Sequence, residues 1–165
     1  MSPLQKKISG LALFDGASFC VMGALTVICA IVWPDFTGGM VGVALLTLGG
    51  IELHGRTLLR LGLPRATGWL VASQLGLLAA ILAYCWGNIE HPRELPLDQV
   101  SPQLLELLQT SPGFEGGLEE TLQPLMRVAF SLFMLISIFY QGGMAMYYLR
   151  KTPLALQVPP PLPPA

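Results

Sequence analysis

Four long apolar runs, separated by shorter polar segments, dominate the pattern of this sequence. They cover approximately residues 8–33, 37–55, 66–87 and 124–149. Each run is long enough to cross a hydrocarbon core of roughly 30 Å as a helix, although the second is only just so. Pro34 cannot continue the first helix, and Pro124 suits the first turn of the last one. The pattern predicts an all-α, polytopic membrane protein with a four-transmembrane-helix bundle over residues 1–151.

Composition supports a chain that lies in lipid. Apolar residues make up 53% of the sequence and charged residues only 12%, whereas an average soluble domain is about 25% charged. The mean hydropathy is +0.61. So little charge cannot cover the surface of a soluble monomer, which excludes that class. A net charge of −1 and the lack of a basic stripe with aromatic residues also exclude nucleic acid as a partner. The expected environment is the lipid bilayer.

The few charges are unevenly placed along the chain. Basic residues flank the ends of the predicted helices on one side: Lys6, Lys7, Arg56, Arg60, Arg65, Arg150 and Lys151. Acidic residues gather on the other side, at Asp35 and in the loop of residues 88–123. The positive-inside rule therefore predicts that both termini are cytoplasmic. We expect a multi-pass protein of the plasma membrane, the inner membrane of a bacterium, whose first span is retained because it is too long for a secretory signal.

Two segments outside the spans have a recognisable pattern. In the outer loop, Ser101 and Pro102 form a helix start, and the leucines that follow predict a short amphipathic helix. That helix could lie on the membrane and cap the bundle, or it could dock a partner. Residues 152–165 form a proline-rich C-terminal tail. The tail could be a merely extended segment or a ligand for an aromatic groove.

Small residues recur every four positions in the first three spans, which places them on one face of each helix. In lipid, such faces allow helices to pack closely. The residues expected to make these contacts are Ala12, Gly16, Gly42, Gly50, Ala72 and Gly76. The stripe of the second span also includes His54, which we expect to point into a helix contact. The same faces could serve contacts within the bundle or contacts with another subunit.

Polar residues inside the spans are the candidate site. They are Asp15, Glu52, His54, Gln74 and Gln141, joined at the membrane edge by Arg56. All of them fall in the predicted cytoplasmic half, and Glu52 can pair with Arg56 at i,i+4. One interpretation is a proton- or cation-coupled site in which Asp15 titrates. The other is a structural cluster of interhelical hydrogen bonds and salt bridges.

Motifs of known enzyme classes are missing from the sequence. There is no Cys-x-x-Cys, no His-x-x-x-His, no phosphate loop and no nucleophile elbow. We therefore expect no enzyme, no cofactor and no metal. The first functional hypothesis is an accessory or structural subunit of a membrane complex, bound to other membrane subunits or to itself. The alternative is a small proton- or cation-coupled transporter. A third and weaker idea is a lipid enzyme that uses Glu52, His54 and Arg56.

Overall fold

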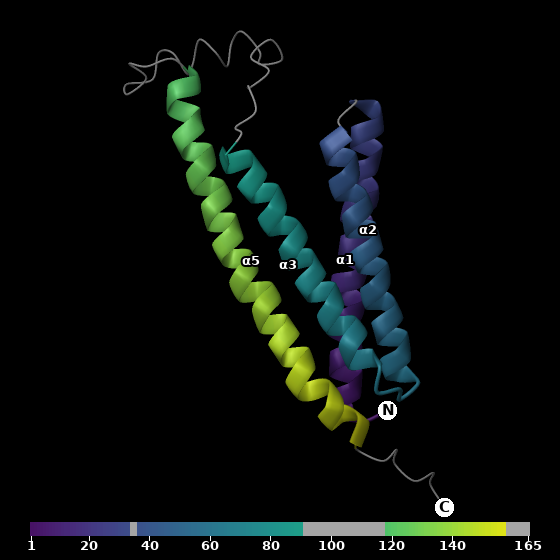
Figure 1. Ribbon diagram of the computed structural model, residues 1–165. Coiled ribbons are helices and arrows are strands. Elements are labelled where there is room, and N and C mark those ends of the chain that lie inside the picture. The colour runs from purple at the N-terminus through teal and green to yellow at the C-terminus, as the bar shows by residue number, and fades with distance from the viewer. Residues whose placement is uncertain (34–35, 91–117, 158–165) are drawn as a thin grey trace, which may run out of the picture. The chain divides into compact units, whose positions relative to one another are not determined.

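The computed structural model describes residues 1–33, 36–90 and 118–157, and side chains in the last range from residue 123 onward. Within these residues every regular element is an α-helix. The helices are α1 (Pro3–Val32), α2 (Phe36–Arg60), α3 (Ala66–Glu90) and α5 (Leu118–Gln157) (Figure 1). All four are long and apolar enough to cross a membrane. The predicted all-helical, four-span membrane architecture is confirmed at this level.

All four helices are longer than the hydrophobic pattern alone indicates, and α2 and α3 end at Arg60 and Glu90 instead of near residues 55 and 87. The first begins at Pro3 because the Ser2 side chain caps it by accepting a hydrogen bond from the Gln5 amide at 3.1 Å. The last begins at Leu118, ahead of Pro124, and continues to Gln157, so that the first residues of the predicted tail are helical. Residues 158–165 lie outside the described residues, and so does the amphipathic helix predicted from Ser101.

The turn after α2 has a recognisable helix-end geometry. Gly62 has a φ of 73°, a left-handed conformation that glycine adopts without steric cost. The Gly62 amide donates to the Leu59 carbonyl at 3.0 Å, and the Leu63 amide donates to the Leu58 carbonyl at 3.0 Å. This pair of bonds is a Schellman motif, which satisfies carbonyls at the helix end and directs the chain into α3.

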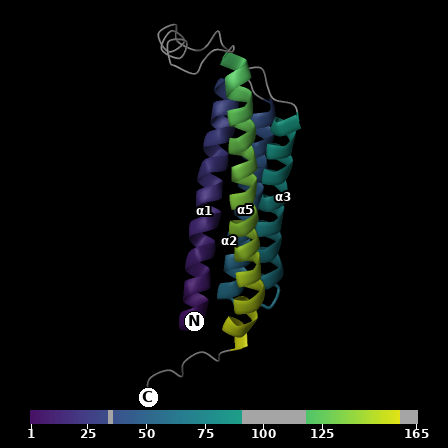
Figure 2. The same ribbon diagram turned by 90° about the vertical axis from the view of Figure 1, so that its left-hand side faces the viewer.

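The chain forms two compact units, which we describe separately. Unit 1 comprises residues 1–81 and 137–165, and unit 2 comprises residues 82–136. In unit 1, the start of α1, the turn between α2 and α3, and the end of α5 all lie at the same end (Figures 1 and 2). The basic residues that flank these segments therefore share one end of unit 1, as their charge pattern predicted. In unit 2, the ring of Tyr84 of α3 lies edge-on to the ring of Phe130 of α5, with the two ring centroids 6.1 Å apart.

In unit 1, α1 and α2 form an antiparallel hairpin with close backbone contacts. A Cβ on Gly23 would lie 2.8 Å from the Gly42 carbonyl, and one on Gly42 would lie 2.9 Å from the Gly23 carbonyl. Seven residues away on each helix, a Cβ on Gly49 would lie 2.8 Å from the Gly16 carbonyl. Another seven residues on, Arg56 Nε donates to the Ser9 carbonyl at 3.1 Å. Only glycine permits approaches this short between helix backbones.

This seven-residue register corrects part of the expected packing stripes. Ala12, Gly16 and Gly42 are buried as expected, and a Cβ on Gly76 would meet the Leu48 side chain. Gly50 and Ala72 are exposed instead, and a Cβ on Gly50 would meet nothing within 4 Å. The reason is that nearly antiparallel helices contact each other with a period of 3.5 residues, which leads from Gly42 to Gly49. A four-residue spacing drifts away from that seam.

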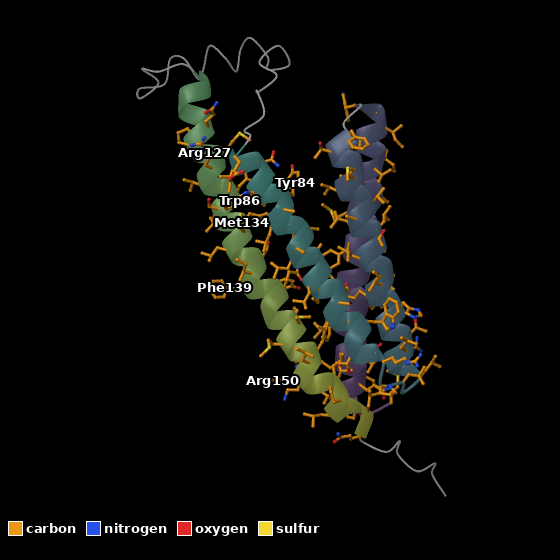
Figure 3. All side chains as sticks on the ribbon, in the orientation of Figure 1. Tyr84, Trp86, Arg127, Met134, Phe139 and Arg150 are labelled. Atoms are coloured by element: carbon orange, nitrogen blue, oxygen red, sulfur yellow. The ribbon has the colours of Figure 1, made fainter. Side chains whose placement is uncertain are left out.

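The interior of unit 1 combines an apolar core that includes Ile8, Leu59 and Leu70 with buried polar side chains, and its exterior is apolar. Large apolar side chains point outward, including Phe14 at 71% exposed, Ile31 at 74% and Phe139 at 73%. Phe139 projects away from the neighbouring ribbons (Figure 3). Polar side chains are instead buried: Ser9, Asp15, Glu52, Ser73, Gln74, Gln141 and Thr152. An apolar exterior around buried polar side chains suits hydrocarbon as the solvent.

Candidate functional site

The candidate site is a group of buried polar side chains in unit 1 that we call the carboxyl cluster. Its members are Asp15 of α1, Glu52 of α2, Ser73 and Gln74 of α3, and Tyr140 and Tyr148 of α5. Each of the four helices contributes at least one side chain. The cluster therefore joins all four spans within this unit.

Glu52 is the centre of the hydrogen bonding and is 0% exposed. Its Oε1 accepts from the Tyr148 hydroxyl at 2.9 Å and from Gln74 Nε2 at 2.9 Å. Its Oε2 accepts from Gln74 Nε2 at 2.8 Å and lies 3.0 Å from the Ser73 hydroxyl. Both oxygens are thus satisfied by neighbours on two other helices, which ties α2 to α3 and α5.

The Ser73 hydroxyl can form a hydrogen bond with either protonation state of Glu52, the neutral acid or the carboxylate. Ser73 Oγ lies 3.0 Å from both Glu52 Oε2 and the Leu48 carbonyl. A hydroxyl has one hydrogen, so it donates to only one of these acceptors at a time. When it donates to Leu48, its oxygen is free to accept a proton held by Glu52. When it donates to Glu52, it stabilises the carboxylate.

Asp15 has a poorer set of partners. It is 4% exposed, and its Oδ1 accepts from the Tyr140 hydroxyl at 3.2 Å, a long distance for an O–H···O hydrogen bond. Its Oδ2 is buried and has no hydrogen-bond partner. Three other buried oxygens share this condition: Gln74 Oε1, Gln141 Oε1 and Thr152 Oγ1. Asp15 Oδ2 is therefore one of four buried oxygens of the described residues that have no hydrogen-bond partner.

The partners of the two carboxyls are all neutral within the described residues. Asp15 and Glu52 also lie near enough to interact electrostatically. Moving a carboxylate out of water without a cation beside it is costly, because neutral donors replace only part of its hydration. Ionisable residues inside membrane spans, such as Asp15 and Glu52, are the default candidates for function.

Two residues of the predicted cluster lie elsewhere. His54 is exposed, and its ring lies edge-on to Trp69 of α3 with centroids 5.0 Å apart, so it touches a neighbouring helix from the outside. Arg56 bonds to the Ser9 carbonyl of α1 and is not paired with Glu52 as expected. Glu52, His54 and Arg56 therefore have three separate sets of partners. The structure brings Glu52 and Gln74 together and buries Asp15 and Gln141 on the facing helices.

Ser73, Tyr140 and Tyr148 are cluster members that the sequence reasoning missed. A tyrosine near the end of a span suits a membrane interface, yet Tyr148 is 0% exposed and bonds to Glu52. One signal could have identified it. Tyr148 follows Gln141 by seven residues and precedes Thr152 by four, so the three polar residues share one face of α5.

Within the described residues, no group of His, Cys, Asp and Glu side chains is placed to hold a metal ion. No protein-family model, no curated protein and no solved structure matches this sequence. The argument for function therefore depends on the residues themselves.

Proposed function

We propose that this integral membrane protein acts as an accessory, structural subunit of a membrane protein complex. The observation that carries the proposal is that its glycines fall into two groups. The first group lies in the α1–α2 contact, where an added Cβ would press against the facing helix: Gly16, Gly23, Gly42 and Gly49. Gly10 of α1 and Gly68 of α3 face open space, where a Cβ would meet nothing within 4 Å.

Among the glycines that face open space, Gly10 and Gly68 line hollows on the described surface. One hollow is lined by Gly10, Leu13, Phe14, Ala17, Ser18, Val21 and Met22 of α1. The other is lined by Arg65, Gly68, Trp69 and Ala72 at the start of α3. Small residues beside bulky ones on a membrane helix give a second helix room to approach closely. These two faces are where another span would pack.

The hydrogen-bonded centre of the carboxyl cluster agrees with an architectural role. Glu52, Ser73, Gln74 and Tyr148 bond to one another across three helices. The three hollows described on the surface are lined by other residues. The start of α1 and the end of α5 lie beside the basic residues at one end of unit 1 (Figures 1 and 2). The positive-inside rule predicts that this end faces the cytoplasm, and the bacterial inner membrane is the proposed location.

The test is co-purification with matched variants. The tagged chain is solubilised from its native membranes in a mild detergent, and its partners are identified by cross-linking and mass spectrometry. We expect Gly10→Leu or Gly68→Leu to release a partner by filling its hollow. Gly50→Leu is the control, because Gly50 is also open but lines neither hollow. A monomer free of partners, or partners retained in both variants, would contradict the proposal.

A second candidate is a small proton- or cation-coupled transporter. The specific observation in its favour is the buried, unpartnered Oδ2 of Asp15. The transporter hypothesis requires that Asp15→Asn and Glu52→Gln abolish transport or a growth phenotype. His54→Ala should leave either readout unchanged, because His54 is exposed beside Trp69. If all three variants behaved as the wild type, this candidate would be excluded.

A further inference from the structure

We propose that Asp15 is a reversible proton-binding site inside unit 1, whereas Glu52 is held in place by its hydrogen bonds. The inference goes beyond the accessory role and does not depend on it, because a structural subunit and a transporter could each bind a proton here. It assigns different tasks to the two buried acids of the carboxyl cluster. Glu52 joins helices, and Asp15 exchanges a proton with the surroundings.

The two acids differ in the number of donors that they receive. Glu52 accepts from Tyr148 and Gln74 and has Ser73 within reach, at distances of 2.8 to 3.0 Å. Asp15 has the Tyr140 hydroxyl alone, at 3.2 Å. Because an ionised carboxylate is purely an acceptor, its charge is stabilised in proportion to the donors around it. Of the two, Asp15 is the acid whose charge the fold leaves less compensated.

Adding a proton to Asp15 Oδ2 removes that charge and changes the role of the atom. The unpartnered acceptor becomes a hydroxyl donor, and the charge of the cluster rises by one. The bond to Tyr140 can persist, because it involves the other oxygen. Protonation therefore resolves the one unsatisfied atom of Asp15 without disturbing the contact that joins α1 to α5.

The acid form needs an acceptor, and α5 offers one in Gln141. Tyr140 and Tyr148 reach Asp15 and Glu52 from positions eight residues apart on α5. Gln141 lies between them in the sequence and is only 5% exposed. Its Oε1 is buried and unpartnered. Gln141 Oε1 is therefore an unpartnered acceptor on α5, directly after Tyr140, which bonds to Asp15.

The surroundings of Asp15 include few other ionisable groups. α2 contributes Glu52, α3 contributes the neutral Ser73 and Gln74, and α5 contributes the phenols of Tyr140 and Tyr148. The cation of Arg56 is engaged with the Ser9 carbonyl, almost two turns before Asp15 on α1. An alkali ion would need oxygen ligands on several sides, whereas a proton needs one donor site and one acceptor. Of the unpartnered buried oxygens, Asp15 Oδ2 is the carboxylate oxygen, the one that can take up a proton.

Infrared spectroscopy of the full chain in phosphatidylcholine liposomes tests this proposal. Difference spectra between acidic and alkaline buffers should show the carbonyl band of a protonated carboxylic acid that appears and disappears reversibly. All carboxyls of the chain contribute to this band, so the component due to Asp15 is the one that is absent in Asp15→Asn and retained in Glu52→Gln and in Glu90→Gln, whose carboxyl is exposed at the end of α3. Circular dichroism establishes that each variant keeps its helices.

A second pair of variants keeps the test decisive if Asp15→Asn misfolds. Tyr140→Phe removes the hydrogen-bond donor that stabilises the Asp15 carboxylate. The pH midpoint of the Asp15 band should therefore rise by about 0.5–1 pH unit, the equivalent of one neutral hydrogen bond. Tyr147→Phe, outside the cluster, should leave it unchanged. The proposal is overturned if the reversible acid bands of Asp15→Asn and the wild type are the same. It is also overturned if sodium ions abolish the Asp15 component at constant pH, which would indicate an alkali-ion site.

Discussion

The two sides of α2 are held to their neighbours by different kinds of contact. Toward α1, the helices meet backbone to backbone at Gly23 and Gly42 and at Gly16 and Gly49. Toward α3 and α5, Glu52 and its hydrogen-bond donors add a buried polar contact to the close approach of Gly55 to Leu70. Because lipid is as apolar as leucine, burial of apolar surface does little to bring membrane helices together. This protein uses both of the available substitutes: backbone-to-backbone glycine packing is most extensive toward α1, and the hydrogen bonds of a buried carboxyl are found toward α3 and α5.

The two kinds of contact should respond to mutation in opposite ways. A close backbone contact fails when an atom is added, because the helices must separate along their whole seam. A hydrogen-bonded contact fails when an atom is removed, because donors are left unpaired in a dry interior. Substitutions that add or remove a few atoms therefore separate the two mechanisms.

The largest effect is expected for Glu52→Leu. The change leaves Gln74 and Tyr148 without their shared acceptor, whereas Ser73 keeps the Leu48 carbonyl. We expect a cost of about 3 kcal/mol from the two buried donors that lose their partner. The measurement is reversible unfolding in detergent micelles titrated with a denaturing detergent. His54→Leu is the control, and it should change the free energy of unfolding by about 0.5 kcal/mol or less, because His54 is exposed. Equal effects at the two positions would refute the role of Glu52.

A smaller loss is expected for Gly49→Ala on the other side of α2. The new Cβ would lie 2.8 Å from both the Gly16 carbonyl and Cys20 Sγ, and such overpacking costs about 1–3 kcal/mol. Gly50→Ala is the matched control one residue away, where the added methyl meets nothing. It should be neutral or stabilising by up to about 1 kcal/mol, since alanine favours the helix. The same unfolding titration compares the two, and a seam that tolerates Gly49→Ala would not be close-packed.

The smallest effect is expected for Tyr148→Phe. This substitution keeps the ring and deletes only the hydroxyl that donates to Glu52 Oε1 at 2.9 Å, so we expect a loss of about 0.6–1.7 kcal/mol. Tyr147→Phe deletes the same atom from the neighbouring ring, which is outside the Glu52 hydrogen bonds, and should have less than half of that effect. If both tyrosines tolerated the change equally, the bond would contribute nothing measurable.

The number of spans could be predicted from the sequence, because the apolar runs are long and clearly bounded. The helix ends were less predictable. Ser2 and Pro3 start α1 before its first apolar residue, and α5 passes through Pro124 to begin at Leu118. A hydropathy pattern reports where a helix meets lipid, whereas caps and polar flanks determine where it begins.

The faces of the helices were harder to predict than their number. The stripe through Gly42, Gly50 and His54 follows a four-residue spacing, but the partner helix selects the seven-residue seam through Gly42 and Gly49. This choice turns His54 outward and Glu52 inward. It depends on the crossing of two helices, which no single helix encodes. Tyr148 was missed for a related reason, since a tyrosine near a helix end suits an interface as well as a hydrogen bond.

The most direct test of the account is a double-mutant cycle between Glu52 and Tyr148. The claim at stake is that hydrogen bonds inside an apolar exterior join α2 to α5. Unfolding free energies of Glu52→Leu, Tyr148→Phe and the double variant should be non-additive by about 1 kcal/mol, as for residues that share a bond. The corresponding cycle with Tyr147→Phe should be additive within about 0.3–0.5 kcal/mol. Additivity in both cycles would contradict the account.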